Sequence, residues 1–285
     1  MSDTPHQHKP NRVVAGVTAF GQSAINAHGK LFNGLRYLGG LGYMLFDALV
    51  WINRGLFTRT TKLGRPAVVS QMVRVGVRSI PIIVLVQTFI GIILALQMAP
   101  TLEAYGSLER VANIIGIAVF RELGPLLSAI VLSGFAGASI AAEIGAMVES
   151  EEIKALRAHA LNPIRFLVVP RFIATVIMLV CLAILADVVG VMGGLFTSWF
   201  VLDIPPVKYL YFTQEALVYK DFFTGLVKAG VFGILISMIA CYEGFNVTGG
   251  AEGVGRATTS TVVKSIVALI ATDCVFTTFF YLFEL

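Results

Sequence analysis

Long apolar stretches with almost no charge limit the folds open to this chain more than any other feature. The clearest, residues 79–102, has no charged side chain and a strongly apolar core from Ile80 to Leu96. Such a stretch can cross about 30 Å of hydrocarbon as a helix. The whole chain is 56% hydrophobic and 13% charged, whereas soluble domains average roughly 45–50% and about 25%. We therefore expect an all-α membrane protein with several spans.

Four further stretches have the same character and are broken by few charges. The dipeptide Arg121-Glu122 interrupts the second stretch, Asp187 the third, Lys228 the fourth and Asp273 the fifth. Because each remaining run is apolar and long enough to cross the bilayer, we predict five transmembrane helices. They cover approximately residues 79–102, 113–142, 172–202, 222–242 and 265–283.

The basic residues are distributed unevenly between the segments that connect these spans. Residues 1–78 carry ten Lys and Arg, residues 143–171 four and residues 244–264 two, whereas the opposite loops carry three. Basic loops stay on the cytoplasmic side of a membrane. The pattern predicts a cytoplasmic N-terminus, and it explains the basic net charge without a nucleic-acid partner.

The segment 31–52 allows two interpretations. Its only charges are Arg36 and Asp47, so it could form a sixth span, in which case the first 30 residues would lie outside. Four glycines between residues 34 and 42 weaken a spanning helix, and a helix lying in the membrane interface is the alternative.

Charged residues inside apolar spans are expensive, so each one is a candidate for function. Asp187 and Asp273 could instead form ion pairs that hold helices together, with Lys228 or Arg121 as partners. Neighbouring residues on a helix diverge by about 100°, so we do not expect Arg121 and Glu122 to share a face. At least one of them should point into a cavity or a subunit contact, where Arg121 could receive a phosphate.

Two clusters of small residues predict close packing between helices. The first contains Gly134 and Ala138 at small-xxx-small spacing, and the second is the run Gly190–Gly194.

The loop 143–171 contains a short amphipathic pattern that ends at Asn162 and Pro163. A solvated linker is the simplest interpretation, but it would leave Ile153 and Leu156 exposed. A protein partner on the cytoplasmic face is therefore favoured.

Other chemistries find little support in the sequence. All four histidines lie outside the predicted spans, which argues against a haem or metal site there. The run Gly250–Thr258 loosely follows a phosphate-binding loop, but it lacks the Gly-Lys-Ser/Thr ending. We therefore expect no cofactor in this chain and no catalytic residues. If ATP drives its function, ATP and magnesium bind to another subunit.

Several motifs, in this order and spacing, resemble the MlaE (YrbE) family of ABC-transporter permeases, which serve lipid transport together with MCE proteins. The similarity covers roughly Gly39 to the C-terminus. The matching stretches are Phe120–Pro125, Ala142–Met147, Glu151–Leu156, Asn162–Pro163, Pro170–Phe172, Gly249–Thr259 and Asp273.

The resemblance implies a homodimeric permease of the bacterial inner membrane that moves phospholipid or a related lipid. An N-terminal interfacial helix at 31–52 would follow a cytoplasmic tail of residues 1–30, and residues 31–285 would form the permease domain. Arg121 and Glu122 would line or support a lipid pocket between the two copies. An external ring of MCE domains would continue the lipid path.

The resemblance also implies that Glu149–His159 forms a coupling helix seated in a groove of a cytoplasmic ATPase. Residues expected to take part in this contact are Glu149, Glu151, Glu152, Ile153, Leu156 and Arg157.

One position departs from the family pattern. Many relatives have Arg where this chain has Phe135, a position that we assign to the substrate site with Arg121 and Glu122. The missing charge bears on the head-group chemistry and on the lipid class.

Two other classes of function remain as alternatives. An ion-coupled transporter would use Asp187, Asp273 and Glu122 for protons and would need no ATPase. A lipid-modifying membrane enzyme would need a metal-ligand or nucleophile constellation, which the sequence does not show.

Overall fold

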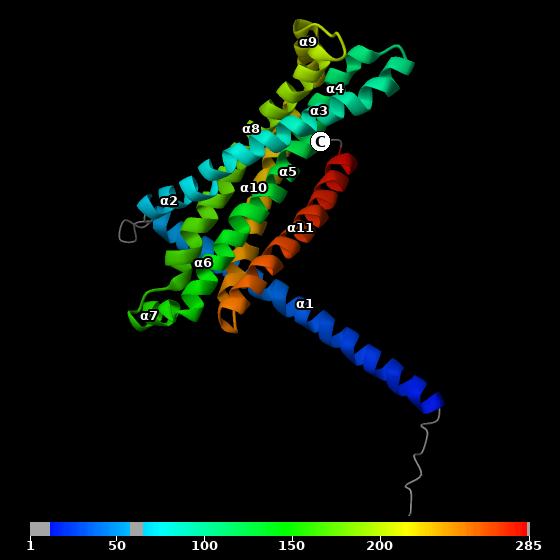
Figure 1. Ribbon diagram of the computed structural model, residues 1–285. Coiled ribbons are helices and arrows are strands. Elements are labelled where there is room, and N and C mark those ends of the chain that lie inside the picture. The colour runs from blue at the N-terminus through cyan, green and yellow to red at the C-terminus, as the bar shows by residue number, and fades with distance from the viewer. Residues whose placement is uncertain (1–11, 58–64, 284–285) are drawn as a thin grey trace, which may run out of the picture. The chain divides into compact units, whose positions relative to one another are not determined.

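The computed structural model describes residues 12–57 and 65–283, with α1 side chains described at 32 and 34–55. All elements in the described part of the chain are helical, which confirms the all-α prediction (Figure 1). The helices are α1 Arg12–Phe57, α2 Arg65–Val75, α3 Ile80–Ala104, α4 Val111–Ala118, α5 Gly124–Leu132, α6 Ala138–Glu149, α7 Glu152–Ala158, α8 Val169–Phe200, α9 Pro206–Ala216, α10 Tyr219–Phe245 and α11 Gly250–Leu282.

Five helical stretches within the described residues are long and apolar enough to cross a membrane, in agreement with the predicted number. Several helices join end to end within them, so each stretch reaches beyond the apolar core recognised in the sequence. The stretches are Arg65–Ala104, Leu108–Glu149, Ile164–Phe200, Tyr219–Phe245 and Gly250–Leu282.

Helix α1 is longer than the predicted interfacial segment 31–52 and includes all of it. It does not belong to the five stretches above. The chain divides into two compact units within α1, 1–44 and 45–285, and the remaining description concerns the second unit. The interfacial position of 31–52 stays a prediction, and residues 1–11 of the predicted tail lie outside the described part.

Helices α8 and α10 form the centre of the bundle. Helix α8 contacts α2, α3, α5 and α10, and α10 also contacts α5, α6 and α11. Half of the most apolar window of α10 is buried inside the protein, compared with 11% of that of α11. Helix α11 therefore lies at the periphery and leaves most of its surface open.

Glycines let α3 and α8 approach until their backbones touch. A methyl group at Gly91 of α3 would meet the carbonyl oxygen of Gly190 and the backbone nitrogen of Gly194. A methyl group at Gly193 would meet the backbone of Thr88. The predicted close packing at Gly190–Gly194 is thus confirmed.

The predicted packing at Gly134 is not found among the described residues. No atom lies within 4 Å of a methyl group built on Gly134, whereas one at Gly137 would contact Ile236 and Thr261. A π-helical turn, Ser133–Gly137, accounts for the difference. This turn adds a residue to the helix and so rotates which small residue faces α10 and α11.

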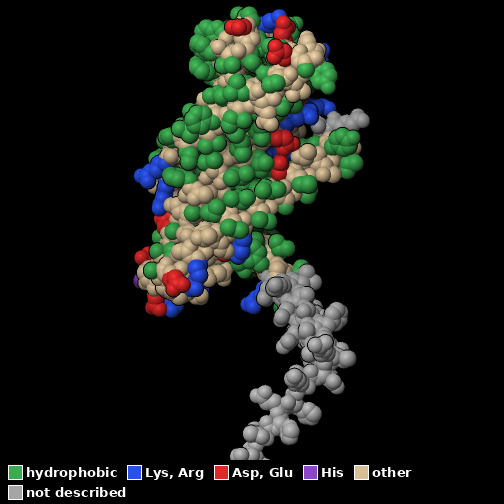
Figure 2. All heavy atoms as spheres, turned by 45° about the vertical axis from the view of Figure 1, so that its right-hand side comes forward, with side chains coloured by type: hydrophobic (Ala, Val, Ile, Leu, Met, Phe, Trp, Pro, Cys, Tyr) green, Lys and Arg blue, Asp and Glu red, His purple; other side chains and the backbone are tan. Residues whose placement is uncertain are grey.

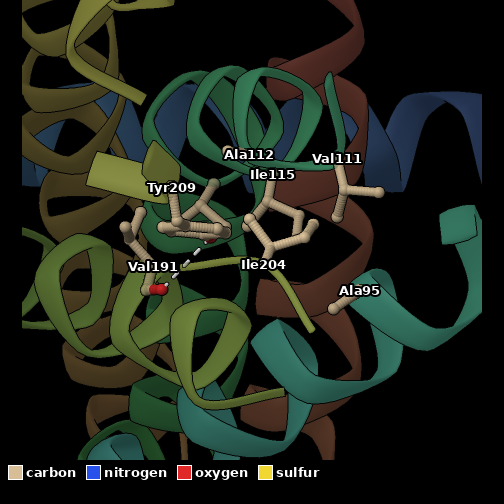
Figure 3. Packing of buried hydrophobic residues seen from close by; sticks show 8 residues of the cluster. Ala95, Val111, Ala112, Ile115, Val191, Ile204 and Tyr209 are labelled. Atoms are coloured by element: carbon tan, nitrogen blue, oxygen red, sulfur yellow. Dashed lines mark hydrogen bonds between the residues drawn. The ribbon is translucent and has the colours of Figure 1, made fainter. Parts of the chain in front are cut away.

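A compact apolar cluster closes the end of the bundle that carries α9 (Figure 3). Tyr209 of α9 is fully buried in it, and its hydroxyl donates a hydrogen bond to the carbonyl oxygen of Val191, with 3.3 Å between the oxygens. Burial raises the pKa of Tyr209 above its ordinary value. The cluster holds α9 to the ends of α3, α4 and α8. Its members are Ala95, Val111, Ala112, Ile115, Val119, Val191, Ile204 and Tyr209.

The outer surface of the bundle is apolar between its two ends. Figure 2 shows hydrophobic side chains over the middle of one face and most charged side chains gathered toward the ends. One face of α3 exposes large side chains at helical spacing, as expected for a surface in contact with lipid tails. They are Ile82, Leu85, Phe89, Ile93 and Leu96.

The contact between α3 and α8 predicts the effect of a single methyl group. Gly91→Ala should lower the free energy of unfolding by about 1–3 kcal/mol, because the methyl group would meet rigid backbone atoms. Gly230→Ala in α10 is the matched control, since its methyl group would lie 3.9 Å from Val180 in ordinary contact. Thermal unfolding in detergent measures both variants. Equal melting temperatures for the two would contradict this packing.

Candidate functional site

A π-helical turn brings Arg121 and Glu122 to the same neighbouring helix. The turn covers Val119–Leu123 and lies between α4 and α5. Arg121 pairs with Asp221, and Glu122 pairs with Lys228, both on α10. Asp221 and Lys228 are seven residues apart, or about two turns, and so lie on one face of that helix. The expectation that Arg121 and Glu122 do not share a face is therefore wrong, because both long side chains reach α10 and line one cavity.

Lys228 lies at the centre of a charged cluster inside the bundle. Its side chain is 1% exposed, and its Nζ lies 2.6 Å from Glu122 Oε2 and 2.9 Å from Asp273 Oδ1 of α11. It also donates to the hydroxyl of Thr277 at 3.0 Å, and that hydroxyl donates to Glu122 Oε1 at 3.0 Å. Two carboxylates and one hydroxyl thus surround the ammonium group, which meets the requirement that a buried charge be paired.

Arg121 extends the cluster toward the start of α10. Its Nε donates to Asp221 Oδ1, while Asp221 Oδ2 accepts the backbone N–H of Val218 at 3.1 Å. Asp221 therefore caps α10 and holds the guanidinium group at once. The Asp221 side chain is 3% exposed and that of Arg121 is 48% exposed. The guanidinium group thus keeps donors available to a ligand.

Arg121, Glu122 and Lys228 line a cavity of about 150 Å³. The phenyl ring of Phe280 covers the ammonium of Lys228, with 5.9 Å between Nζ and the ring centroid. The cavity lies between the start of α10 and the end of α11, toward the end of the bundle that carries α9. Its lining combines charges of both signs with aromatic rings. The lining residues are Arg121, Glu122, Thr224, Lys228, Thr277, Phe280 and Tyr281.

Asp273 forms the predicted ion pair with Lys228, but Asp187 does not pair with Lys228 or Arg121. Asp187 is 2% exposed and packs against Gly124, where its Oδ1 has no hydrogen-bond partner among the described residues. Its helix, α8, directs it to the start of α5, whereas Lys228 is already enclosed by α11 and the π-helical turn.

The structure does not bring Phe135 to the cavity of Arg121 and Glu122. Phe135 is 43% exposed and lines a separate cavity of about 110 Å³ together with Arg74 and Arg78 of the first span. Its π-helical turn, Ser133–Gly137, lies more than two helical turns beyond Glu122 in the same span. Positive charge at this second cavity comes from α2 and the turn that follows it.

Sequence reasoning missed a second ionic cluster, at the opposite end of the bundle. Glu143 of α6 accepts from Arg74 of α2 at 2.8 Å and from Arg171 of α8 at 3.0 Å. Arg171 is buried and also donates to the carbonyl oxygen of Leu167. A Glu and an Arg at the predicted boundaries of two neighbouring spans were the available signal. Asp221 could also have been found, because it lies seven residues before Lys228 and so on the same face of a helix.

The predicted coupling segment is divided between two helices. Glu149 ends α6, Glu151 adopts a left-handed conformation with φ 60°, and Glu152 begins α7. Ile153 is 6% exposed and Leu156 is half-buried, so the exposure of these two residues that a solvated linker would bring, which favoured a protein partner, is not found. The left-handed residue Glu151 turns the chain between α6 and α7, and the two helices remain in contact.

The outer surface of α7 is nevertheless charged. Glu152, Lys154 and Arg157 are exposed. Lys154 Nζ lies 2.6 Å from Glu151 Oε1, and this hydrogen bond, with the positive charge, lowers the pKa of the Glu151 carboxyl. Helix α7 therefore presents ionised groups of both signs at the tip of the bundle. Their contact with a partner stays a prediction.

Comparison with known proteins decides the class. A family model described as permease MlaE matches residues 68–279, which include every charged residue of the cavity. This chain belongs to the MlaE permease family. Membership makes it a multi-pass transport subunit rather than a catalytic one.

Relatives from distant organisms align over most of this permease. A "Probable ABC transporter permease protein" of Rickettsia felis is 39% identical over 214 residues, or 75% of this chain and 83% of the relative. The "Intermembrane phospholipid transport system permease protein MlaE" of Haemophilus influenzae is 31% identical over 255 residues, or 89% and 95%. "Protein TRIGALACTOSYLDIACYLGLYCEROL 1, chloroplastic" of Arabidopsis thaliana is 34% identical over 211 residues, or 74% and 60%.

The charged cluster predicts a large cost for removing its cation alone. Lys228→Met should lower the free energy of unfolding by about 3 kcal/mol or more, because two carboxylates would remain without a counter-charge. Adding Glu122→Gln and Asp273→Asn to that variant should restore much of the stability. Thermal unfolding in detergent gives the comparison.

Lys208→Met is the control for this prediction, since Lys208 pairs with Glu109 at the exposed end of the bundle. Exposed pairs contribute about 0–1 kcal/mol. A Lys228→Met variant as stable as the control would contradict the buried pairing.

Proposed function

We propose that this chain is the membrane-spanning subunit of an ABC transporter that moves phospholipid between the bacterial inner membrane and an MCE-protein conduit. A separate cytoplasmic ATPase would bind ATP and magnesium and supply the energy. The observation that carries the proposal is the charged, aromatic-lined cavity of Arg121, Glu122 and Lys228 inside an otherwise apolar bundle. The name of the Haemophilus influenzae relative supports phospholipid as the cargo.

The charges of the cavity suit a head group that carries both signs. Arg121 keeps almost half of its side chain exposed and offers paired donors to a phosphate. Glu122 is one-third exposed and its carboxylate can accept from a head-group ammonium. Cluster charges sum to one excess negative charge, since Lys228 and Arg121 face Glu122, Asp273 and Asp221. A zwitterionic phospholipid satisfies both sides of this arrangement.

In the orientation predicted from the basic loops, the cavity would lie toward the external leaflet. The basic loops 143–171 and 244–264 lie at the end with α7, whereas the cavity lies toward α9. A lipid held at the cavity would have a short path to an external MCE ring. The N-terminus would be cytoplasmic in this orientation.

A second copy of the chain would complete the cavity. The cavity borders α11, most of whose surface is open within one copy. At Gly134 and Gly255, one copy of the chain also leaves open space where a side chain would project. A homodimer that pairs these surfaces would enclose lipid between two sets of Arg121 and Glu122.

Coupling to the ATPase would pass through α7. The exposed groups at and beside this helix, Glu151, Glu152 and Arg157, could pair with a charged groove, while its Ile153 is buried in the protein. Closing of the ATPase dimer would push α7 and α6, narrow the cavity and release lipid outward.

The same geometry gives little support to ion-coupled transport. Glu122 and Asp273 share the ammonium of Lys228, so neither is a free proton acceptor. Asp187 lies apart from this cluster, against Gly124.

Removing the exposed guanidinium group tests the lipid site. Arg121→Ala should reduce the phospholipid retained by the gently purified transporter about tenfold, because a charge-assisted contact contributes roughly 1.5 kcal/mol. Quantitative mass spectrometry of extracted lipid gives the ratio. Arg110→Ala, on an exposed external turn, is the control. Equal retention by the two variants would refute the role of Arg121.

Reversing charge on α7 tests the ATPase contact. Glu151→Lys with Glu152→Lys should abolish co-purification of an ATPase subunit and lipid-stimulated ATP hydrolysis, because the contact surface changes sign. Glu103→Lys with Glu215→Lys makes the same charge change at exposed sites of the opposite end. Proteomics of the tagged protein identifies the subunit. If the α7 variant retained its ATPase and its stimulated hydrolysis, the coupling role would be wrong.

A further inference from the structure

A cation–aromatic cluster lies outside the cavity, at the end of the bundle that carries α7. The guanidinium carbon of Arg165 lies 5.4 Å from the centroid of the Trp51 ring and 5.4 Å from that of Phe166. The guanidinium carbon of Arg54 lies 5.6 Å from the same Trp51 ring. One indole therefore contacts two guanidinium groups from different parts of the chain.

The charge of Arg165 is not balanced by the rings that it contacts. Two guanidinium groups that share one ring centroid are at most about 11 Å apart. No carboxylate pairs with Arg165 among residues 12–57 and 65–283. Cation–π contacts orient the guanidinium group of Arg165 but leave the N–H donors in its plane open to a further acceptor. An anion near the cluster would use those donors of Arg165.

The local fold holds Arg165 at the beginning of a span. Asn162 Oδ1 accepts the backbone N–H of Ile164 at 2.9 Å and so fixes the turn that starts the π-helical segment Ile164–Val168. Apolar helix α8 follows directly. Arg165 therefore lies where the apolar surface of the bundle ends, the depth at which lipid head groups lie and at which tryptophan is enriched. Phe166 is 44% exposed beside it and presents an apolar ring to acyl chains.

We propose that Trp51, Arg54, Arg165 and Phe166 form a binding site for the phosphate of an anionic phospholipid in the cytoplasmic leaflet. The planar guanidinium groups would donate to phosphate oxygens. The rings of Trp51 and Phe166 would contact the glycerol and the upper acyl chain. This site is separate from the cavity of Arg121 and Glu122, which lies toward the opposite end, and it does not depend on transport.

The protein carries its own reporter for this site. Its two tryptophans are Trp51 and Trp199, and Trp199 lies at the far end of α8. In a Trp199→Phe background, fluorescence reports only on Trp51. The full-length, delipidated protein in detergent is titrated with phosphatidylglycerol or phosphatidylcholine that carries bromine on identical acyl positions. Bromine quenches the indole when the acyl chain contacts it.

Phosphatidylglycerol should reach half-maximal quenching at a concentration at least about fivefold lower than phosphatidylcholine, the preference expected for one basic residue near an anionic head group. Arg165→Gln should reduce this preference to less than about twofold. Arg110→Gln removes one arginine from the external end and should leave the preference unchanged. If Arg165→Gln does not fold, Arg54→Gln removes the second guanidinium group and should also weaken the preference.

Three results would overturn the proposal. The first is equal quenching by the two lipids in the parent protein. The second is a preference that persists in the folded Arg165→Gln variant. The third is displacement of phosphatidylglycerol by inorganic phosphate at the same concentration, which would assign the site to a soluble phosphate instead of a lipid.

Discussion

The buried ammonium group of Lys228 is the interaction on which the rest of the site depends. An unpaired charge in an apolar bundle would be prohibitively costly, and here two carboxylates and a hydroxyl surround it. Those partners come from the π-helical turn after α4 and from α11, so the ion pairs bind three spans together. The same groups leave the edge of the cluster polar and partly open. A single arrangement thus holds the helices in register and creates the cavity between them.

Much of the fold could be predicted because lipid permits few alternatives. Apolar runs gave the number of spans, and the glycines at Gly190–Gly194 gave one close helix contact. The π-helical turns could not be predicted from periodicity, since such a pattern assumes 3.6 residues per turn throughout the span. The same limitation misplaced Gly134. The burial of Ile153 could not be predicted, because the turn between α6 and α7 depends on the left-handed conformation of Glu151. Glycine usually occupies such a position, and here no glycine marks it.

The partners of the intramembrane charges were predicted only in part. Asp273 and Lys228 are both isolated charges in apolar runs, so their pairing follows from the cost of leaving either alone. Asp187 has the same sequence signal but faces Gly124, and only the crossing of α8 and α5 determines that direction. Asp221 lies seven residues before Lys228 and so shares its face of α10. Its pairing with Arg121 could not be predicted, because it depends on the side chain of Arg121 reaching that helix. A charged residue in an apolar span is therefore a good indicator of a structural or functional role. It is a poorer indicator of which residue forms the partner.

The proposed function requires that the cavity beside Lys228 hold a lipid. A photo-crosslinking amino acid in place of Phe280, whose ring covers the ammonium, tests this most directly, with position 89 on the lipid-facing surface of α3 for comparison. Each protein is purified, washed extensively in detergent, irradiated and analysed for lipid adducts by mass spectrometry. We expect that phospholipid adducts at position 280 survive washing that removes those at position 89. Loss of adducts at the same rate from both positions would contradict it.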